Sequence, residues 1–250
     1  MIGNFERIPV ARIIDKVDAL FNKNDYTEAG RLLAYWRDEA VSFGDKHGEL
    51  AMESELVGYY RKQNDCEKGL ASIAKALTLT EELGQTELAS GATILINCAT
   101  AYKAFGMAKE ALPLYIRAEQ TYRKVLAPDD ARFGGLYNNM ALALVDLKQF
   151  EQAESAYLSA LDVMQKVSRG EAESAITYIN MAHMYEDFGK QENIQECMQK
   201  AYSLLQSDAL PRNGYYAFVL EKCAPSFGHF GDAAICEQMK KEAEEIYARA

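Results

Sequence analysis

The chain has 250 residues and a net charge of -10 at pH 7, with acidic residues outnumbering basic ones by 37 to 27. Because this charge repels phosphate backbones, we expect no general nucleic-acid role. No apolar run is long enough to span a bilayer, and residues 1–11 lack the apolar centre of a secretion signal, so we expect a cytoplasmic protein with no membrane contact.

The five cysteines form no CxxC pair. Most fall on predicted apolar helix faces, where cysteine behaves as a small hydrophobic residue. We therefore expect reduced thiols in a reducing compartment. They are Cys66, Cys98, Cys197, Cys223 and Cys236.

An internal repeat organises the whole chain. A pattern that begins with Asn97 and Tyr102 and continues to Tyr115 recurs 42 positions later, beginning with Asn139 and including Tyr157. The same spacing, extended toward both ends of the chain, predicts a turn between two helices in each repeat. Most of these turns begin with Asn-Asp or Gly, which tolerate a tight helix ending. The turns are Asn24-Asp25, Asn64-Asp65, Gly106-Met107, Lys148-Gln149, Gly189-Lys190 and Gly231-Asp232.

Small residues recur where two helices must cross closely, and larger apolar residues alternate with them at helical spacing. No stretch alternates with period two, so we expect an all-α protein without strands. The small set is Val17, Val57, Ala99, Ala141, Ala182 and Ala224 in the first helices, Ala29, Gly69, Ala111, Ala153, Ile194 and Cys236 in the second helices, and Trp36, Ala76, Ala118, Ala160, Ala201 and Ala243 near the ends of the second helices.

In chain order, the predicted helical hairpins occupy about 9–44, 48–84, 86–126, 129–169, 170–208 and 211–249. Trp36 replaces the usual alanine, so we expect the first hairpin to be adapted as a cap. Residues 127–130 should break a helix and offer acidic groups to the next helix N-terminus. Pro225 should bend or shorten the helix that contains it. The polar tail 240–249 suits a solvent-facing cap.

The repeated residues resemble tetratricopeptide repeats, and the period resembles the kinesin light chain type. The similarity is closest in residues 110–118, 126–130 and 136–141, and Pro113 stands inside a helix as in that subfamily. The resemblance implies one right-handed α-solenoid of about six helix-turn-helix repeats over residues 1–250. Its first helices would line a concave groove that binds an extended peptide or a partner helix, and such proteins are usually adaptors or scaffolds without catalytic chemistry.

Asparagines occupy one equivalent position in three consecutive repeats, namely Asn97, Asn139 and Asn180. Asparagine is a poor interior helix residue, so its recurrence indicates a shared task. The resemblance implies that these amides face the groove and hold a peptide backbone, since an amide both donates and accepts. The alternative is that each bonds to a neighbouring helix. Asn138 is a further candidate.

Other side chains should share that face by helical spacing. Arg61 and Lys103 are candidates to hold a carboxylate, or they are simply solvated. Leu142 is a candidate apolar pocket, or it packs against the next repeat. Thr100 and His183 complete the predicted peptide-binding set, with Glu186 beside His183. The basic carboxylate clamp of chaperone-binding repeats is incomplete.

No nucleophile elbow, phosphate loop or HExxH motif occurs, so we expect no enzyme, no metal and no cofactor. His183 and Glu186 are predicted to be a structural or solvated pair, and His47 and His229 to be isolated near turns.

The aromatic residues Tyr215, Tyr216 and Phe218 are predicted to cover the C-terminal end or to form a dimer patch. A homodimer through an end repeat, a self-assembling oligomer and a bacterial peptide-sensing regulator are the alternatives to a peptide-binding adaptor.

Overall fold

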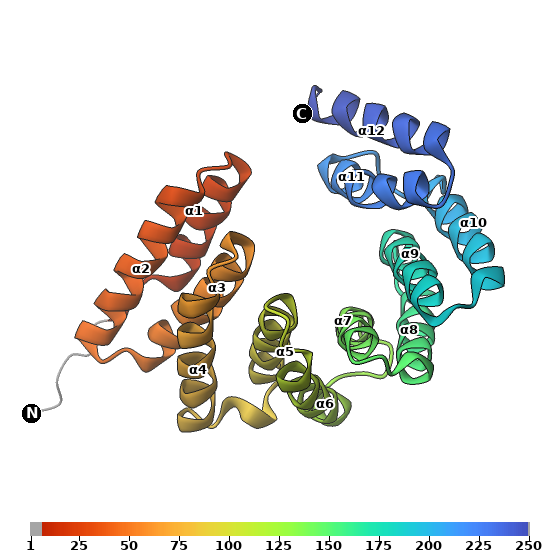
Figure 1. Cartoon of the computed structure of the whole chain (residues 1–250). Coiled ribbons are helices and arrows are strands. Elements are labelled where there is room, and N and C mark those ends of the chain that lie inside the picture. Colours follow the sequence, from red (N-terminus) through yellow and green to blue (C-terminus); the bar gives the residue numbers. More distant parts are fainter. Residues whose placement is uncertain (1–6, 250) are drawn as a thin grey trace, which may run out of the picture. The chain divides into compact units, whose positions relative to one another are not determined.

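The computed structural model describes residues 7–249, which form twelve α-helices and two short 3₁₀ helices, with no strand in that range (Figure 1). Residues 1–6, which belong to the segment considered as a secretion signal, lie outside the described residues, as does Ala250. None of the described helices is long and apolar enough to cross a membrane. The all-α prediction is confirmed.

Each helix packs against its chain neighbour as an antiparallel hairpin, in the order in which the repeats were predicted. The first helices of the hairpins are α1 (Val10–Asn22), α3 (Lys46–Gln63), α5 (Ala89–Ala104), α7 (Arg132–Asp146), α9 (Glu171–Phe188) and α11 (Gly214–His229). The second helices are α2 (Tyr26–Phe43), α4 (Cys66–Glu82), α6 (Ala108–Val125), α8 (Phe150–Met164), α10 (Ile194–Leu205) and α12 (Ala233–Tyr247). The 3₁₀ helices η1 (Gln85–Glu87) and η2 (Gln191–Asn193) precede α5 and α10.

Every predicted hairpin turn begins with a residue in the left-handed conformation, whether or not that residue is glycine. The φ angles are 57° at Asn24, 54° at Asn64, 77° at Gly106, 60° at Lys148, 79° at Gly189 and 101° at Gly231. The next residue then donates its backbone N–H five residues back, for example from Gln149 to Leu144 at 2.9 Å. This bond satisfies one carbonyl that the end of a helix leaves free.

Aspartate side chains begin several helices. Asp25, Asp45 and Asp65 each accept a hydrogen bond from the backbone N–H three residues later. Between α6 and α7, Asp130 accepts from the backbone N–H of Arg132 at 3.0 Å. The neighbouring guanidinium lowers the pKa of Asp130 to about 2, so the carboxylate stays charged beside the start of α7. The expected helix break, with an acidic residue at the start of the next helix, is confirmed, although α7 has no side-chain cap at its N-cap residue Ala131.

The small positions form the helix contacts, and all of them are buried except Trp36, which is half-buried. A side chain of one or two carbons lets two helix axes approach, which is why alanine recurs there. The cysteines are free, and only Cys66 is exposed. Pro225 does not shorten its helix, because α11 continues to His229.

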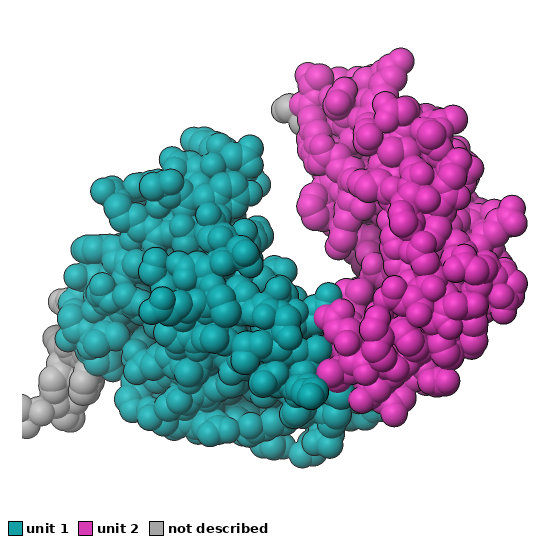
Figure 2. All heavy atoms as spheres, viewed as in Figure 1, with its two compact units in different colours: residues 1–126 teal, residues 127–250 magenta. Residues whose placement is uncertain are grey.

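Contacts along the chain divide it into two compact units, residues 1–126 and 127–250 (Figure 2). Within unit 1, α3 packs against α5 and the second helices α2 and α4 pack against the first helix that follows. Within unit 2, α9 packs against α7, α8 and α11. A single superhelical domain over the whole chain stays a prediction.

Candidate functional site

Each unit carries a face built from the outward side chains of its first helices, called here the first-helix face. In unit 2 it includes Asn138, Asn139 and Leu142 of α7, Asn180 and His183 of α9, and Tyr215, Phe218 and His229 of α11. Neighbouring helices are linked across this face by hydrogen bonds whose partners lie 42 or 43 residues apart, which is one repeat period. The repeat therefore determines which side chains meet.

Asn138 links α7 to α9. Its Oδ1 accepts from Asn180 Nδ2 at 3.1 Å and from Thr177 Oγ1 at 3.3 Å. Two of the predicted peptide-binding amides, Asn138 and Asn180, are thus bonded to each other across neighbouring helices, which is the alternative to ligand binding for these two residues. Both remain only half-buried. A ligand that bound the Asn180 amide would compete with, or add to, the hydrogen bond from Asn180 Nδ2 to Asn138.

Asn139, beside Asn138, is different. It is half-buried, and it makes no hydrogen bond to any residue that the structure describes. Neither of its side-chain polar atoms belongs to the buried groups that lack a partner, so the amide reaches solvent. Leu142, one helical turn further along α7, is also half-buried. The two residues offer an unengaged amide beside an apolar side chain.

In unit 1 a hydrogen bond likewise links two first helices, α3 and α5, but it is longer than the one between α7 and α9. Asn97 on α5 is exposed and donates to Ser54 Oγ on α3 at 3.3 Å. Thr100 faces its own hairpin, because its hydroxyl donates to the carbonyl of Ile96 and lies 3.0 Å from the hydroxyl of Tyr115. Burial raises the pKa of Tyr115 to about 12, so that hydroxyl stays protonated. Thr100 is consequently engaged within its own repeat.

The two basic candidates of unit 1, Arg61 and Lys103, are both half-buried on α3 and α5. Lys103 has an interaction partner within the described residues. Their role in holding a carboxylate stays a prediction.

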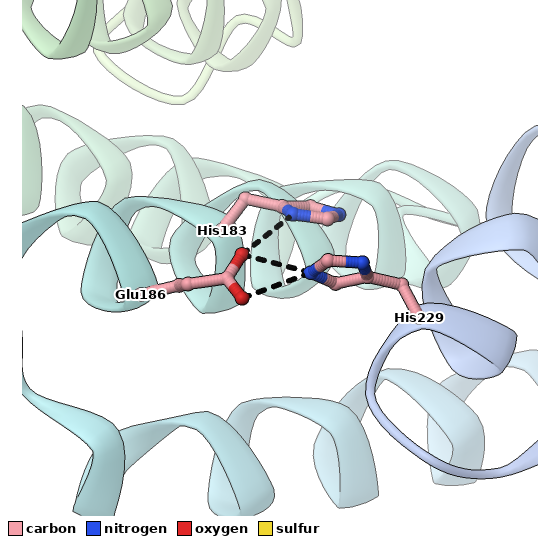
Figure 3. Close-up of side chains that lie close together, drawn as sticks. All are labelled: His183, Glu186 and His229. Carbon is pink, nitrogen blue, oxygen red and sulfur yellow. Dashed lines mark hydrogen bonds and ion pairs between the residues drawn. The ribbon is translucent and has the colours of Figure 1, made fainter.

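Three side chains gather where α9 and α11 end on the same side of unit 2 (Figure 3). His229 Nε2 lies 2.9 Å from both carboxylate oxygens of Glu186, and His183 Nδ1 lies 3.8 Å from Glu186 Oε2. The expectation that His229 is isolated is therefore wrong. It failed because His229 lies 43 residues after Glu186, and one repeat period places such residues on adjacent first helices.

The surroundings hold the two imidazoles in place. His183 Nε2 lies 2.9 Å from Ser226 Oγ on α11, and the ring of Phe230 packs against His183 at 4.8 Å and His229 at 4.7 Å between centroids. The pKa of His183 is lowered, first by burial and then by the neighbouring His229. A lowered pKa favours the neutral imidazole, which can act as an electron-pair donor.

The C-terminal aromatic residues divide into a buried and an exposed set. Tyr216 is 2% exposed, its hydroxyl donates to the carbonyl of Leu205, and the guanidinium of Arg212 stacks on its ring. Tyr215 and Phe218 are each 51% exposed and stack on one another, and the Tyr215 hydroxyl donates to Glu173 on α9. Tyr216 is thus a core residue, and the exposed pair lies on the first-helix face.

Each unit also contains a cavity. In unit 1, a cavity of about 350 Å³ is lined by Arg37, Glu53, Tyr60, Lys68, Ala71 and Ser72. Burial raises the pKa of Glu53, and its Oε2 accepts no hydrogen bond within the described residues. In unit 2, a cavity of about 580 Å³ lies beside α10 and is lined in part by Met198, Phe227 and Phe230.

The architecture defines a class first: a protein of repeated α-helical hairpins whose recurring small residues are buried where helices meet. Residues 133–207 match the tetratricopeptide repeat family model. This match covers part of unit 2, and the repeats of that family generally serve in protein interaction and are typically non-catalytic. No curated protein matches the chain by sequence.

Solved structures share this fold at low sequence identity. A kinesin light chain protein with nearly identical TPR-like repeats from Podospora anserina has a TM-score of 0.68 at 17% identity, covering 80% of this chain and 97% of its own. BtubC, also called BKLC, from P. vanneervenii has a TM-score of 0.55 at 20% identity, covering 97% and 92%. PilF from Pseudomonas aeruginosa has a TM-score of 0.56 at 12% identity, covering 96% and 97%. At these identities the likeness establishes the fold.

Proposed function

We propose that the chain is an adaptor that binds an extended peptide segment on the first-helix face of unit 2, with Asn139 as the central contact. The observation that carries the proposal is the unengaged, solvent-reaching amide of Asn139 beside the bonded pair Asn138 and Asn180. A half-buried amide without a protein partner is available to a ligand at little cost, because no existing hydrogen bond must break.

The chemistry of the face suits a peptide main chain. An amide side chain can donate to a peptide carbonyl and accept from a peptide N–H at the same time, without regard to the peptide's sequence. Leu142 on α7, and Tyr215 and Phe218 on α11, add apolar contact area on the same face. We therefore expect a ligand with at least one apolar side chain.

Unit 1 by itself offers a separate candidate contact through Asn97 and Arg61. Asn97 is exposed, and its bond to Ser54 is long at 3.3 Å, so a ligand can replace it easily. Arg61 would hold a carboxylate of the partner. The general use of tetratricopeptide repeats in protein interaction supports an adaptor role by analogy of fold.

The test begins with affinity capture from lysate of the source organism, followed by mapping of the captured partner to a synthetic peptide. The affinity of that peptide is then measured by isothermal titration calorimetry. We expect Asn139→Ala to weaken binding about tenfold, which corresponds to the loss of one or two hydrogen bonds. Gln152→Ala is the matched control, since this exposed amide lies on α8, the second helix of the same hairpin.

Equal peptide affinity in wild type and Asn139→Ala would show that the ligand lies elsewhere. In that case Arg61→Ala and Phe218→Ala, measured with the same peptide, would report whether another part of the first-helix faces is used. If all three variants bind like wild type, the proposal fails.

A further inference from the structure

The geometry points to a Zn²⁺-type divalent metal site in unit 2, formed by His183 Nδ1, one carboxylate oxygen of Glu186 and His229 Nε2. This inference does not rest on peptide binding, because it concerns side chains that already converge without a ligand (Figure 3). Two imidazoles and one carboxylate are a donor set that Zn²⁺ accepts, with a fourth position left open.

The spacing of the three donor atoms fits one cation. All three lie within 4.8 Å of one another, with 2.9 Å between His229 Nε2 and Glu186 and 3.8 Å between His183 Nδ1 and Glu186. In a tetrahedral site with bonds of about 2.0–2.1 Å, donor atoms are separated by about 3.3 Å. The observed distances bracket this value, so small side-chain rotations would complete the site.

The two helices α9 and α11 bring the three donor side chains together. His183 and Glu186 are three residues apart on α9, so they lie on one face of that helix. His229 is the last residue of α11, and α11 packs against α9. Each ligand is therefore held by a helix rather than by a loop, which limits the entropy lost on metal binding.

The hydrogen bond between His183 and Ser226 favours the tautomer of His183 that a metal ion requires, in which Nδ1 carries no proton. Its Nε2 lies 2.9 Å from the hydroxyl of Ser226, a residue that is only 9% exposed. If Nε2 carries the proton and donates to Ser226, Nδ1 presents its lone pair toward Glu186. A fixed partner on the second ring nitrogen is the usual way in which a metal-binding histidine is oriented.

The site is also accessible. The side chains of His183, Glu186 and His229 are 43%, 39% and 50% exposed, so an ion can enter and water can fill the remaining position. The competing explanation is a metal-free ion pair between Glu186 and a protonated His229. An exposed pair of that kind is worth little, whereas three ligands on one ion would join the ends of α9 and α11.

The experiment is a calorimetric titration of Zn²⁺ into the full chain, prepared without a histidine tag and treated with chelator. The Cys66→Ser background removes the one exposed thiol, which could bind zinc by itself. We expect one ion per chain, and an affinity at least tenfold lower in Glu186→Gln and in His229→Gln. His47→Gln is the matched control and should bind like the parent, since His47 lies in unit 1 beside Gln85.

Two further readouts separate this site from other binding. With Co²⁺ the parent should show the visible absorption of a tetrahedral ion bound by nitrogen and oxygen, without a thiolate charge-transfer band. Zn²⁺ should raise the melting temperature of the parent and not that of His229→Gln. Binding that is absent from the parent, or that is equal in the parent and His229→Gln while both remain folded, would overturn the inference.

Discussion

At the scale of single residues, the hairpin turns depend on one backbone position. Gly106, Gly189 and Gly231 adopt a positive φ without strain, whereas Lys148 does so at φ 60° with a full side chain. For a residue with a Cβ this conformation costs about 1–2 kcal/mol, because the Cβ crowds the following carbonyl. The left-handed conformation at this turn is therefore kept in the fourth repeat although lysine disfavours it.

Exchanging residue types between two of these turns should therefore change stability in opposite directions. Gly106→Ala should lower the free energy of unfolding by about 1 kcal/mol through backbone strain alone, since an added Cβ there meets no atom within 4 Å. Lys148→Gly should raise it by up to about 1 kcal/mol. Urea denaturation followed by circular dichroism measures both.

Lys148 makes two side-chain contacts within the described residues, one of which is a cation–π contact at 5.5 Å from the centroid of the Phe150 ring. In the other, its ammonium lies 3.4 Å from Asp187, an exposed pair whose contribution should be small. Asp187→Ala removes that pair and leaves the turn unchanged. If Lys148→Gly were as destabilising as Gly106→Ala, strain at this turn would not be the dominant effect.

At the scale of helices, hydrogen bonds between first helices recur at one repeat period. Asn138 bonds to Asn180 at a separation of 42 residues, and Asn97 to Ser54 and His183 to Ser226 at 43. Small residues hold each hairpin together by close packing, and these polar pairs add directional contacts between successive hairpins. The first-helix face is therefore partly structural, and only some of its amides remain for a ligand.

Substitutions of the two adjacent asparagines on α7 should have different effects, because Asn138 bonds to α9 and Asn139 does not. Asn138→Ala removes the acceptor of two hydrogen bonds between α7 and α9, and should lower the free energy of unfolding by about 1–2 kcal/mol. Asn139→Ala should change it by less than about 0.5 kcal/mol, because no such bond is lost.

Thermal and urea denaturation of both variants test this difference. They also establish whether Asn139→Ala is folded well enough to serve in the binding experiment. A large stability loss in Asn139→Ala would mean that this amide has a structural role, and its place as the central peptide contact would have to be abandoned.

At the scale of the whole molecule, self-assembly through the C-terminal aromatic residues is one alternative to a peptide-binding adaptor. Only Tyr215 and Phe218 of that predicted patch are exposed, since Tyr216 is in the core. A stable dimer usually buries about 800 Å² on each partner, more than two half-exposed side chains provide.

We therefore expect a monomer of 27.9 kDa in solution at micromolar concentration. Multi-angle light scattering after gel filtration measures the mass directly. Phe218→Asp should leave the mass unchanged, while Tyr216→Asp is unsuitable as a probe because it would place a charge in the core. A mass of two chains that returns to one in Phe218→Asp would instead support self-assembly.

The sequence by itself determined the helical hairpins, their order and their turns. Those features depend on local chemistry that repeats: alanine where helices cross, as at Ala141 and Ala182, and a residue that can end a helix, as at Asn64 and Gly189. It also identified Asn97, Asn139 and Asn180 as equivalent positions. It could not say which of them was already bonded.

Only the tertiary structure decided which side chains of neighbouring first helices bond to each other. Asn138 lies 42 residues before Asn180, and Glu186 lies 43 before His229, so each pair meets only when neighbouring first helices pack side by side. A shift of one residue in that packing would turn the side chains to different partners, because successive helix residues point about 100° apart. The repeat period limits the candidates, and the packing of small residues between helices selects among them.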